Sequence, residues 1–211
     1  MEDNHYNYQK VKKKYLKFIS SQEVMSEPFR DKLKQLNKFY LPISKMIKDE
    51  YIKKKRTKVI GLTGGQGTGK STISNVLKII LKEAYKLETV IFSIDDFYKT
   101  FRERKKMSKR INSLFLTRGV PGTHDTKMLF QCIKSLKDNK FKKLTIPKFD
   151  KSIDNRSSKN KWLKIKKKPN IVIFEGWCVG ATAQKNKDLN LPVKYPPVYP
   201  FTLVLFFFIY S

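Results

Sequence analysis

Residues 61–72 carry the residue types of a phosphate-binding loop. Gly64 is followed, after four residues, by Gly69, Lys70 and Ser71. Glycines let successive backbone N–H groups point at one centre, and the N-terminus of a following helix adds partial positive charge. Lys70 would reach the terminal phosphates of a nucleotide, and the Ser71 hydroxyl would bind Mg²⁺. The residues predicted to bind ATP are Gly64, Gly65, Gln66, Gly67, Thr68, Gly69, Lys70, Ser71 and Thr72.

The flanking segments fit this loop. Residues 58–63 form a short apolar run with β-branched members, which is typical of a buried parallel strand. After Lys70, apolar residues recur at the spacing of one helix face, from Ile73 to Ala84. The order strand, glycine-rich loop, helix is the setting in which such a loop binds phosphates.

Acidic residues follow two further apolar runs. Asp95 and Asp96 come after residues 89–94, and Glu175 comes after residues 170–174. The carboxyl ends of parallel strands meet at one edge of a sheet, so these carboxylates are expected near the γ-phosphate. We predict that Glu175 helps to hold Mg²⁺ with Ser71, and that an aspartate accepts the proton of a substrate hydroxyl. We favour Asp95 as this base, with Asp96 capping a helix.

Strands that alternate with helices predict an α/β fold. We expect a three-layer P-loop NTPase fold with a mostly parallel sheet. Residues 1–57 would form a basic N-terminal extension and helical entry divided at Pro42, and residues 58–211 the nucleotide-binding domain. Residues 100–114 are strongly charged and predict an exposed helix or loop, whereas Asp125 or Thr126 would cap a helix. The apolar run 201–210 is too short to span a membrane as a helix and predicts a buried strand.

Charge is the dominant feature of the composition. The 211 residues include 46 Lys and Arg against 18 Asp and Glu, which gives a net charge of +28. Such a charge fits either binding to nucleic acid or an anionic membrane, or a lysine-biased solvated surface. The lysines occur in every segment rather than in one stripe, so we favour the solvated surface and expect no nucleic-acid partner. Two cysteines without zinc-like spacing, and an N-terminus without a signal peptide, indicate a cytoplasmic protein.

Taken together, the motifs resemble the D-glycerate 3-kinase family of plants and fungi, which is related to uridine kinase, phosphoribulokinase and pantothenate kinase. The resemblance covers about residues 28–190. The motifs that carry it are residues 64–72, 93–98, 118–125, 147–152, 155–156 and 174–177, with residues 40–43 in the helical entry.

The resemblance implies ATP-dependent phosphorylation of a small hydroxy acid, D-glycerate, to 3-phosphoglycerate. Asp95 falls at the position of the catalytic base, and Glu175 at the acidic position associated with Mg²⁺. The residues that fall in motifs expected to line the acceptor pocket are Arg118, His124, Lys148, Asp150 and Arg156. Glycerate carries a carboxylate, which needs a cation, best a bidentate arginine, and hydroxyls that need acceptors such as Asp150. The alternatives are a uridine- or pantothenate-type kinase, or an ATP-binding fragment without catalysis.

The family pattern continues beyond residue 211, and the resemblance fades after Leu191. We therefore expect a C-terminally truncated kinase domain, in which the run from Tyr199 stands in for the next core strand of the family. The lid helices that carry arginines would be missing, and such arginines contribute orders of magnitude to phosphoryl transfer. The sequence leaves the oligomeric state open.

Overall fold

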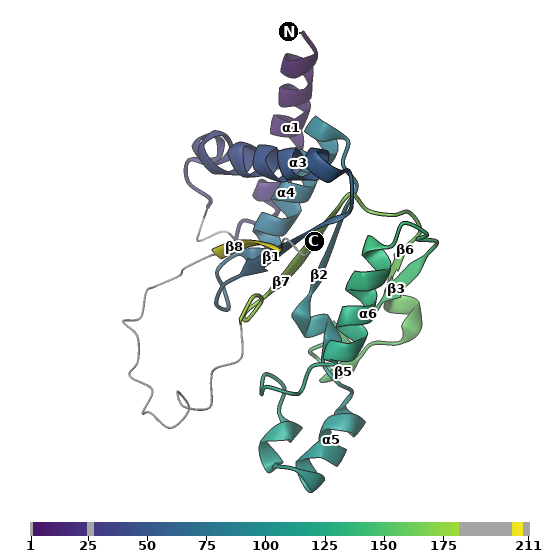
Figure 1. The fold of residues 1–211 in the computed structure, drawn as a ribbon. Helices are drawn as coiled ribbons and strands as arrows, with labels where there is room; N and C mark the ends of the chain where they lie inside the picture. The colour runs from purple at the N-terminus through teal and green to yellow at the C-terminus, as the bar shows by residue number, and fades with distance from the viewer. Residues whose placement is uncertain (1, 25–27, 182–203, 209–211) are drawn as a thin grey trace, which may run out of the picture.

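The computed structural model describes residues 2–24, 28–181 and 204–208, which fold around a four-stranded sheet (Figure 1). The strands, in their order across the sheet, are β2 (Thr89–Ser93), β7 (Ile171–Gly176), β1 (Lys58–Thr63) and β8 (Val204–Phe208). The first three are parallel, and β8 runs antiparallel to β1. The mostly parallel α/β sheet predicted from the sequence is confirmed.

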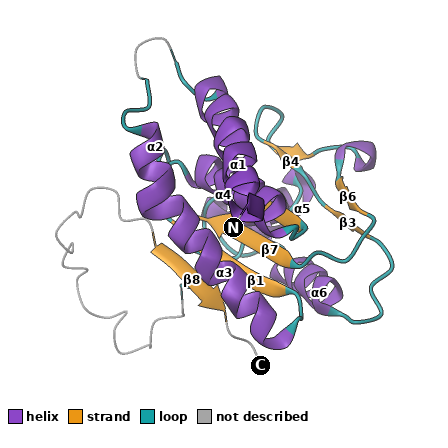
Figure 2. Cartoon of the chain, turned by 90° about the horizontal axis from the view of Figure 1, so that it is seen from above, coloured by secondary structure: helices purple, strands orange, loops and turns teal. Residues whose placement is uncertain are grey.

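Alternate residues of the parallel strands pack on opposite faces. Ile60 and Ile173 face α4 (Lys70–Tyr85) and α3 (Leu41–Lys54), where they pack with Leu77. Val59 and Val172 face the other way, in a core shared with α6 (Thr126–Lys137), β3 (Leu144–Ile146) and β6 (Leu163–Ile165). Figure 2 shows these helices on the two sides of the sheet. Both faces are covered, which explains why the strands read as continuous apolar runs.

The N-terminal segment forms a helix that packs on the nucleotide-loop helix. The buried side chains of α1 (Glu2–Ser21) are Val11, Tyr15 and Ile19, and they share a core with Val76 and Ile80 of α4. Two ion pairs join the same two helices: Glu83 of α4 is 4% exposed and accepts from Lys14 at 2.5 Å and from Lys10 at 3.0 Å. Helix α4 is therefore buried on two sides, which fixes the element that begins at the phosphate-binding loop.

Pro42 does not separate two helices as expected. Helix α2 (Lys32–Gln35) runs into a π-helical turn, η1 (Leu36–Tyr40), and this turn runs directly into α3. Pro42 lies in the first turn of α3. Proline has no amide N–H to donate, and a widened helical turn accommodates that loss without ending the helix.

The segment after β2 builds the rim of the molecule. It contains the 3₁₀ turn η2 (Ile94–Phe97), α5 (Phe101–Arg110) and η3 (Ser113–Leu116). It then continues after α6 through β3, β4 (Phe149–Asp150), β5 (Asn155–Arg156), η4 (Lys159–Lys161) and β6. Helix α6 is capped by Asp125, whose carboxylate accepts from the Met128 N–H at 3.0 Å, as the sequence predicted.

Helix α5 departs from the sequence prediction at Arg104. Most of the helix is exposed as expected, but the Arg104 side chain is fully buried. It donates to backbone carbonyls of Lys99, Leu116 and Asp154 and to the Asp154 carboxylate. A charged side chain is buried here because polar acceptors from three separate segments surround it.

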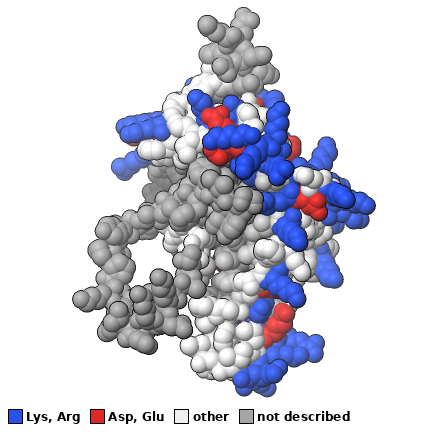
Figure 3. Space-filling model, viewed as in Figure 1, with Lys and Arg blue, Asp and Glu red and all other residues white. Residues whose placement is uncertain are grey.

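The C-terminal apolar run lies only partly in the described residues. Residues 204–208 form β8, as predicted for a strand, while the remaining residues of 182–211 lie outside the described part. In the described residues no helix is long and apolar enough to cross a membrane. Figure 3 shows basic side chains over the N-terminal helices, along the β3–β6 side and at the α5 end of the visible face.

Candidate active site

The phosphate-binding loop connects β1 to α4 and has the backbone that its glycines allow. Gly67 and Gly69 have φ values of 80° and 77°, a region in which a side chain would be strained. The Lys70 ammonium lies across the loop and donates to the carbonyls of Gly64 and Gly65 at 2.8 and 2.5 Å. The loop therefore places the ammonium beside the backbone groups that would surround phosphates.

Glu175 lies at the end of β7, next to the start of α4. Its two carboxylate oxygens accept from the hydroxyls of Ser71 and Ser74 at 2.8 and 2.9 Å, and the residue is 8% exposed. A hydroxyl and a carboxylate at the mouth of a phosphate-binding loop are oxygen ligands of the kind that Mg²⁺ takes, directly or through water. The residues predicted for the metal thus lie together and fit it chemically.

The turn that follows β2 assigns different surroundings to the two aspartates. Asp96 belongs to a capping box: its carboxylate accepts from the Ser93 N–H at 3.1 Å, and Lys148 pairs with it at 3.0 Å. Asp95 instead has one carboxylate oxygen, Oδ2, at 2.8 Å from the Lys151 ammonium. Its other oxygen, Oδ1, is buried and accepts no hydrogen bond from the part of the chain that the structure describes. Asp96 is thus engaged in holding the turn, and Asp95 has one free acceptor.

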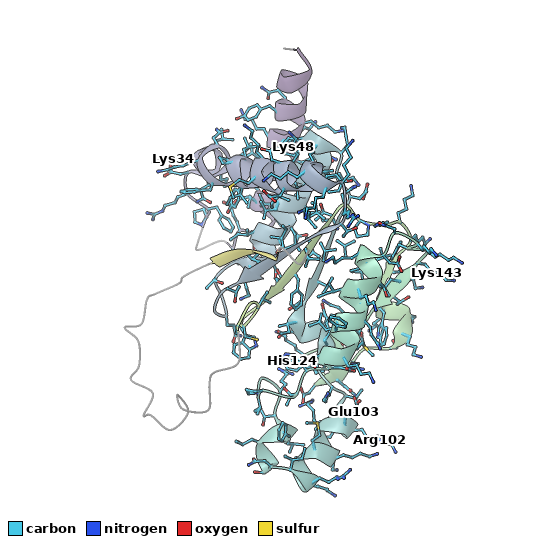
Figure 4. The ribbon with its side chains drawn as sticks, in the orientation of Figure 1. Lys34, Lys48, Arg102, Glu103, His124 and Lys143 are labelled. Carbon is cyan, nitrogen blue, oxygen red and sulfur yellow. The ribbon has the colours of Figure 1, made fainter. Side chains whose placement is uncertain are left out.

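His124 lies beside this turn, where Figure 4 shows it at the end of α6. Its ring stacks on Tyr98 with the centroids 4.1 Å apart, and its Nε2 atom is buried without a hydrogen-bond partner in the described residues. Burial lowers the pKa of His124, while the nearby charge of Asp95 acts in the opposite direction. Burial and then the charge of Asp95 raise the pKa of Tyr98 to about 12. The Asp95 carboxylate, the neutral imidazole and the protonated phenol therefore form one cluster.

The row of rings extends from His124 toward Arg118. Tyr98 packs edge-on against Phe149 with centroids 5.3 Å apart, and the Arg118 guanidinium lies 5.8 Å from the Phe149 ring. Arg118 also donates to the Asp154 carboxylate at 2.6 Å. Two residues of the predicted acceptor pocket, His124 and Arg118, thus lie at opposite ends of one row of rings.

The other predicted acceptor residues make contacts of their own. Arg156 donates to the Tyr98 carbonyl at 2.9 Å and to the Asp125 carboxylate at 3.0 Å, so it ties the segment after η2 and the cap of α6 to β5. Asp150 accepts from the N–H and hydroxyl of Ser152 within a turn. Their roles toward a substrate stay predictions.

Lys148 lies on the border of a separate hollow. An open cavity of about 510 Å³ lies against the outer side of β2. Its lining includes Ile91, Asp96, Lys148 and Trp162, and none of Asp95, His124 or Lys70. Lys148 thus contacts the aspartate that caps the turn rather than the cluster around Asp95.

The sequence interpretation did not single out Tyr98, a member of this cluster, or Lys151, which pairs with Asp95. Both lie in motifs that carry the resemblance: Tyr98 in residues 93–98, three residues after Asp95, and Lys151 in residues 147–152, directly after Asp150. In so lysine-rich a chain, the pairing of Lys151 with Asp95 is visible only once β4 and η2 are placed side by side.

Comparison with known proteins agrees with this geometry. A kinase of Schizosaccharomyces pombe named mug58 is 37% identical over 130 residues, which are 58% of this chain and 46% of that protein. The Saccharomyces cerevisiae protein TDA10, named as a probable ATP-dependent kinase, is 36% identical over 131 residues, 57% of this chain and 45% of its own. The solved structure of D-glycerate 3-kinase from Cryptococcus neoformans superposes with a TM-score of 0.59 at 25% identity, over 71% of this chain and 56% of that one.

The chain spans about half the length of the curated relatives that it matches. The family match extends over residues 59–192, which contain the phosphate-binding loop, both acidic strand ends and the row of rings. The P-loop kinase fold and this match, over more than half of the sequence, show that the chain belongs to the phosphoribulokinase / uridine kinase family.

Proposed function

We propose that this chain is the nucleotide- and acceptor-binding part of an ATP-dependent kinase whose acceptor is a small hydroxy acid, D-glycerate. The observation that carries the proposal is that Asp95 Oδ1 and His124 Nε2 are both buried without a hydrogen-bond partner among the described residues, in two side chains that interact electrostatically. Ser93 and Leu62 are both in register with Glu175, so the turn with Asp95 follows β2 at the same sheet edge as the phosphate-binding loop. A buried acceptor at this edge supports a bound hydroxyl.

The nucleotide site needs one rearrangement. Ser71 and Glu175 would hold Mg²⁺, which would neutralise negative charge on the phosphate oxygens of ATP, the donor of the phosphoryl group. Lys70 then exchanges the carbonyls of Gly64 and Gly65 for phosphate oxygens, which are stronger partners for an ammonium. Glu175 keeps the Ser71 hydroxyl in place through its 2.8 Å hydrogen bond, and its negative charge would balance part of the charge of the cation.

At the acceptor site, Asp95 orients the attacking hydroxyl and takes its proton. The acceptor hydroxyl donates to Oδ1, a new O–P bond forms, the bond to the leaving ADP breaks, and the proton goes to Asp95. His124 is held neutral by burial, so Nε2 accepts from, or donates to, a second acceptor hydroxyl without adding charge. Catalysis in this scheme consists mainly of positioning and electrostatics.

The choice of D-glycerate rests on the sequence motifs and on the C. neoformans enzyme among the structural neighbours. The cations near Asp95 suit an acceptor with a carboxylate, since Arg118 and Lys151 both lie on this side of the turn. Uridine, a neutral acceptor, is the main alternative, because the family includes uridine kinases.

A coupled ADP-release assay tests the proposal, with D-glycerate, uridine and pantothenate as acceptors. We expect saturable turnover with D-glycerate. Lys70→Ala should lower kcat at least about a hundredfold, because it removes a cation from the transferring phosphate, whereas the exposed Lys78→Ala in the same helix should not. Turnover with uridine but not with D-glycerate would overturn the substrate, and MgATP binding without turnover on any acceptor would leave a nucleotide-binding protein.

A further inference from the structure

We propose that Lys151 is the residue that selects acceptors with a carboxylate: it leaves Asp95 to pair with that carboxylate while the acceptor hydroxyl binds Asp95. This inference rests on the proposed kinase function. It concerns a side chain to which the sequence motifs gave no role, and it turns on the 2.8 Å contact between the Lys151 ammonium and Asp95 Oδ2.

Lys151 differs from the other cations by the identity of its partner. The three cations predicted for the acceptor pocket each pair with an aspartate that holds the fold: Lys148 with Asp96 in the capping box, Arg156 with Asp125 at the α6 cap, and Arg118 with Asp154 in the β4–β5 turn. Lys151 alone among these four pairs with the predicted base. Of these four ion pairs, the one between Lys151 and Asp95 can therefore break without releasing a turn or a helix cap.

The backbone of Lys151 is fixed, whereas its tip is free to move. The residue follows β4 in the turn that leads to β5, and Phe149 and Arg156 pair across these two strands. Within the turn, Asp150 accepts from Ser152, and Arg104 and Arg118 both bind Asp154. The Lys151 side chain is nonetheless 61% exposed. Because the backbone of Lys151 is fixed and its ammonium is solvated, the ammonium can change partners at little cost in free energy: exposed ion pairs contribute little to stability.

The two oxygens of Asp95 then define the acceptor. Oδ1 is buried and has no hydrogen-bond partner among the described residues, so a hydroxyl would reach it once the side chains that cover it move, and the ammonium stands beside Oδ2 of the same carboxylate. A ligand that binds both must carry its hydroxyl and its carboxylate only a few bonds apart, as in a three- or four-carbon hydroxy acid. A neutral acceptor offers the ammonium no carboxylate, so Lys151 would remain on Asp95 and the binding energy of the charged pair would be lost.

Three variants separate this role from a structural one. Lys151→Met keeps the length of the side chain without its charge, Lys151→Arg keeps the charge, and Lys159→Met removes an exposed lysine outside the cluster. D-glycerate is compared with glycerol, which has the hydroxyls without the carboxylate. Binding of each to the chain with MgADP is measured by calorimetry, and KM and kcat are measured with MgATP.

We expect Lys151→Met to raise the Kd and the KM for D-glycerate by about ten- to a hundredfold, which corresponds to the loss of one charge-assisted contact. The KM for MgATP should stay near wild type, and Lys151→Arg should restore most of the affinity for D-glycerate. Lys159→Met should change neither the affinity for D-glycerate nor the KM for MgATP. Equal affinity of Lys151→Met and wild type for D-glycerate would overturn the selection role. Wild-type chain that binds D-glycerate without phosphorylating it would overturn the kinase proposal alone, and wild-type chain that does not bind it would overturn both.

Discussion

Replacing Arg104 by Met is expected to destabilise the rim formed by α5, η3 and the β4–β5 turn. The guanidinium is fully buried and donates to Leu116 O at 2.6 Å, to Asp154 O at 2.7 Å, to Asp154 Oδ2 at 2.8 Å and to Lys99 O at 3.3 Å. It therefore ties the end of η3 and the β4–β5 turn to α5. Methionine fills most of the volume but leaves these acceptors without their donor.

The magnitude follows from the exposure of the partners. Breaking a buried ion pair costs about 3 to 5 kcal/mol. The Asp154 side chain is 41% exposed and keeps Arg118 as a partner, so water and Arg118 offset part of the loss. We therefore expect Arg104→Met to lower the free energy of unfolding by about 3 kcal/mol, at the lower end of that range.

Urea denaturation measures this loss. With a slope of about 2 to 3 kcal/mol/M, the midpoint of Arg104→Met should fall by about 1 to 1.5 M. Arg102→Met in the same helix is the matched control, because Arg102 is exposed and Figure 4 shows it at the outer end of the molecule. Its free energy of unfolding should stay within about 0.5 kcal/mol of wild type. Equal midpoints for the two variants would refute the role of Arg104 as the tie between the three segments.

Two further predictions concern the cluster itself. Burial lowers the pKa of His124, so its imidazole should titrate below the ordinary value of about 6.5 in NMR spectra, with the signal assigned by His124→Gln. As pH falls from that value toward the lowered pKa, the unfolded chain takes up the proton first and stability should decline; titration of His124 at or above 6.5 would contradict its burial as a neutral group. Gly176→Ala should reduce kcat more than the affinity for MgATP, because the new methyl group would overlap Ile94 in the turn that carries Asp95. An unchanged kcat would contradict the dependence of catalysis on the position of this turn.

The elements around the nucleotide site could be predicted from the sequence because their signals are local. The apolar run of β1, the glycines after it and the helix spacing after Lys70 lie next to one another, and the structure places β1 and α4 where these patterns do. The cap of α6 is equally local, since Asp125 and the Met128 N–H are three residues apart.

The features that the sequence did not reveal depend on contacts between distant segments. Arg104 lies in a polar helix, and its burial requires acceptors supplied by Leu116 and Asp154. The pairing of Lys151 with Asp95 requires the β4–β5 hairpin to lie against η2. The antiparallel direction of β8 had no signal either, because an apolar run indicates a strand but not its direction.

The most direct test of the account is to follow the phosphoryl group itself by ³¹P NMR. The chain is mixed with MgATP and D-glycerate, and Asp95→Asn is measured beside wild type. We predict that the γ-phosphate signal of ATP declines as the signal of 3-phosphoglycerate grows, and that Asp95→Asn binds MgATP but forms no product. Formation of product at the wild-type rate by Asp95→Asn, or ATP loss that is the same with and without D-glycerate, would contradict the account.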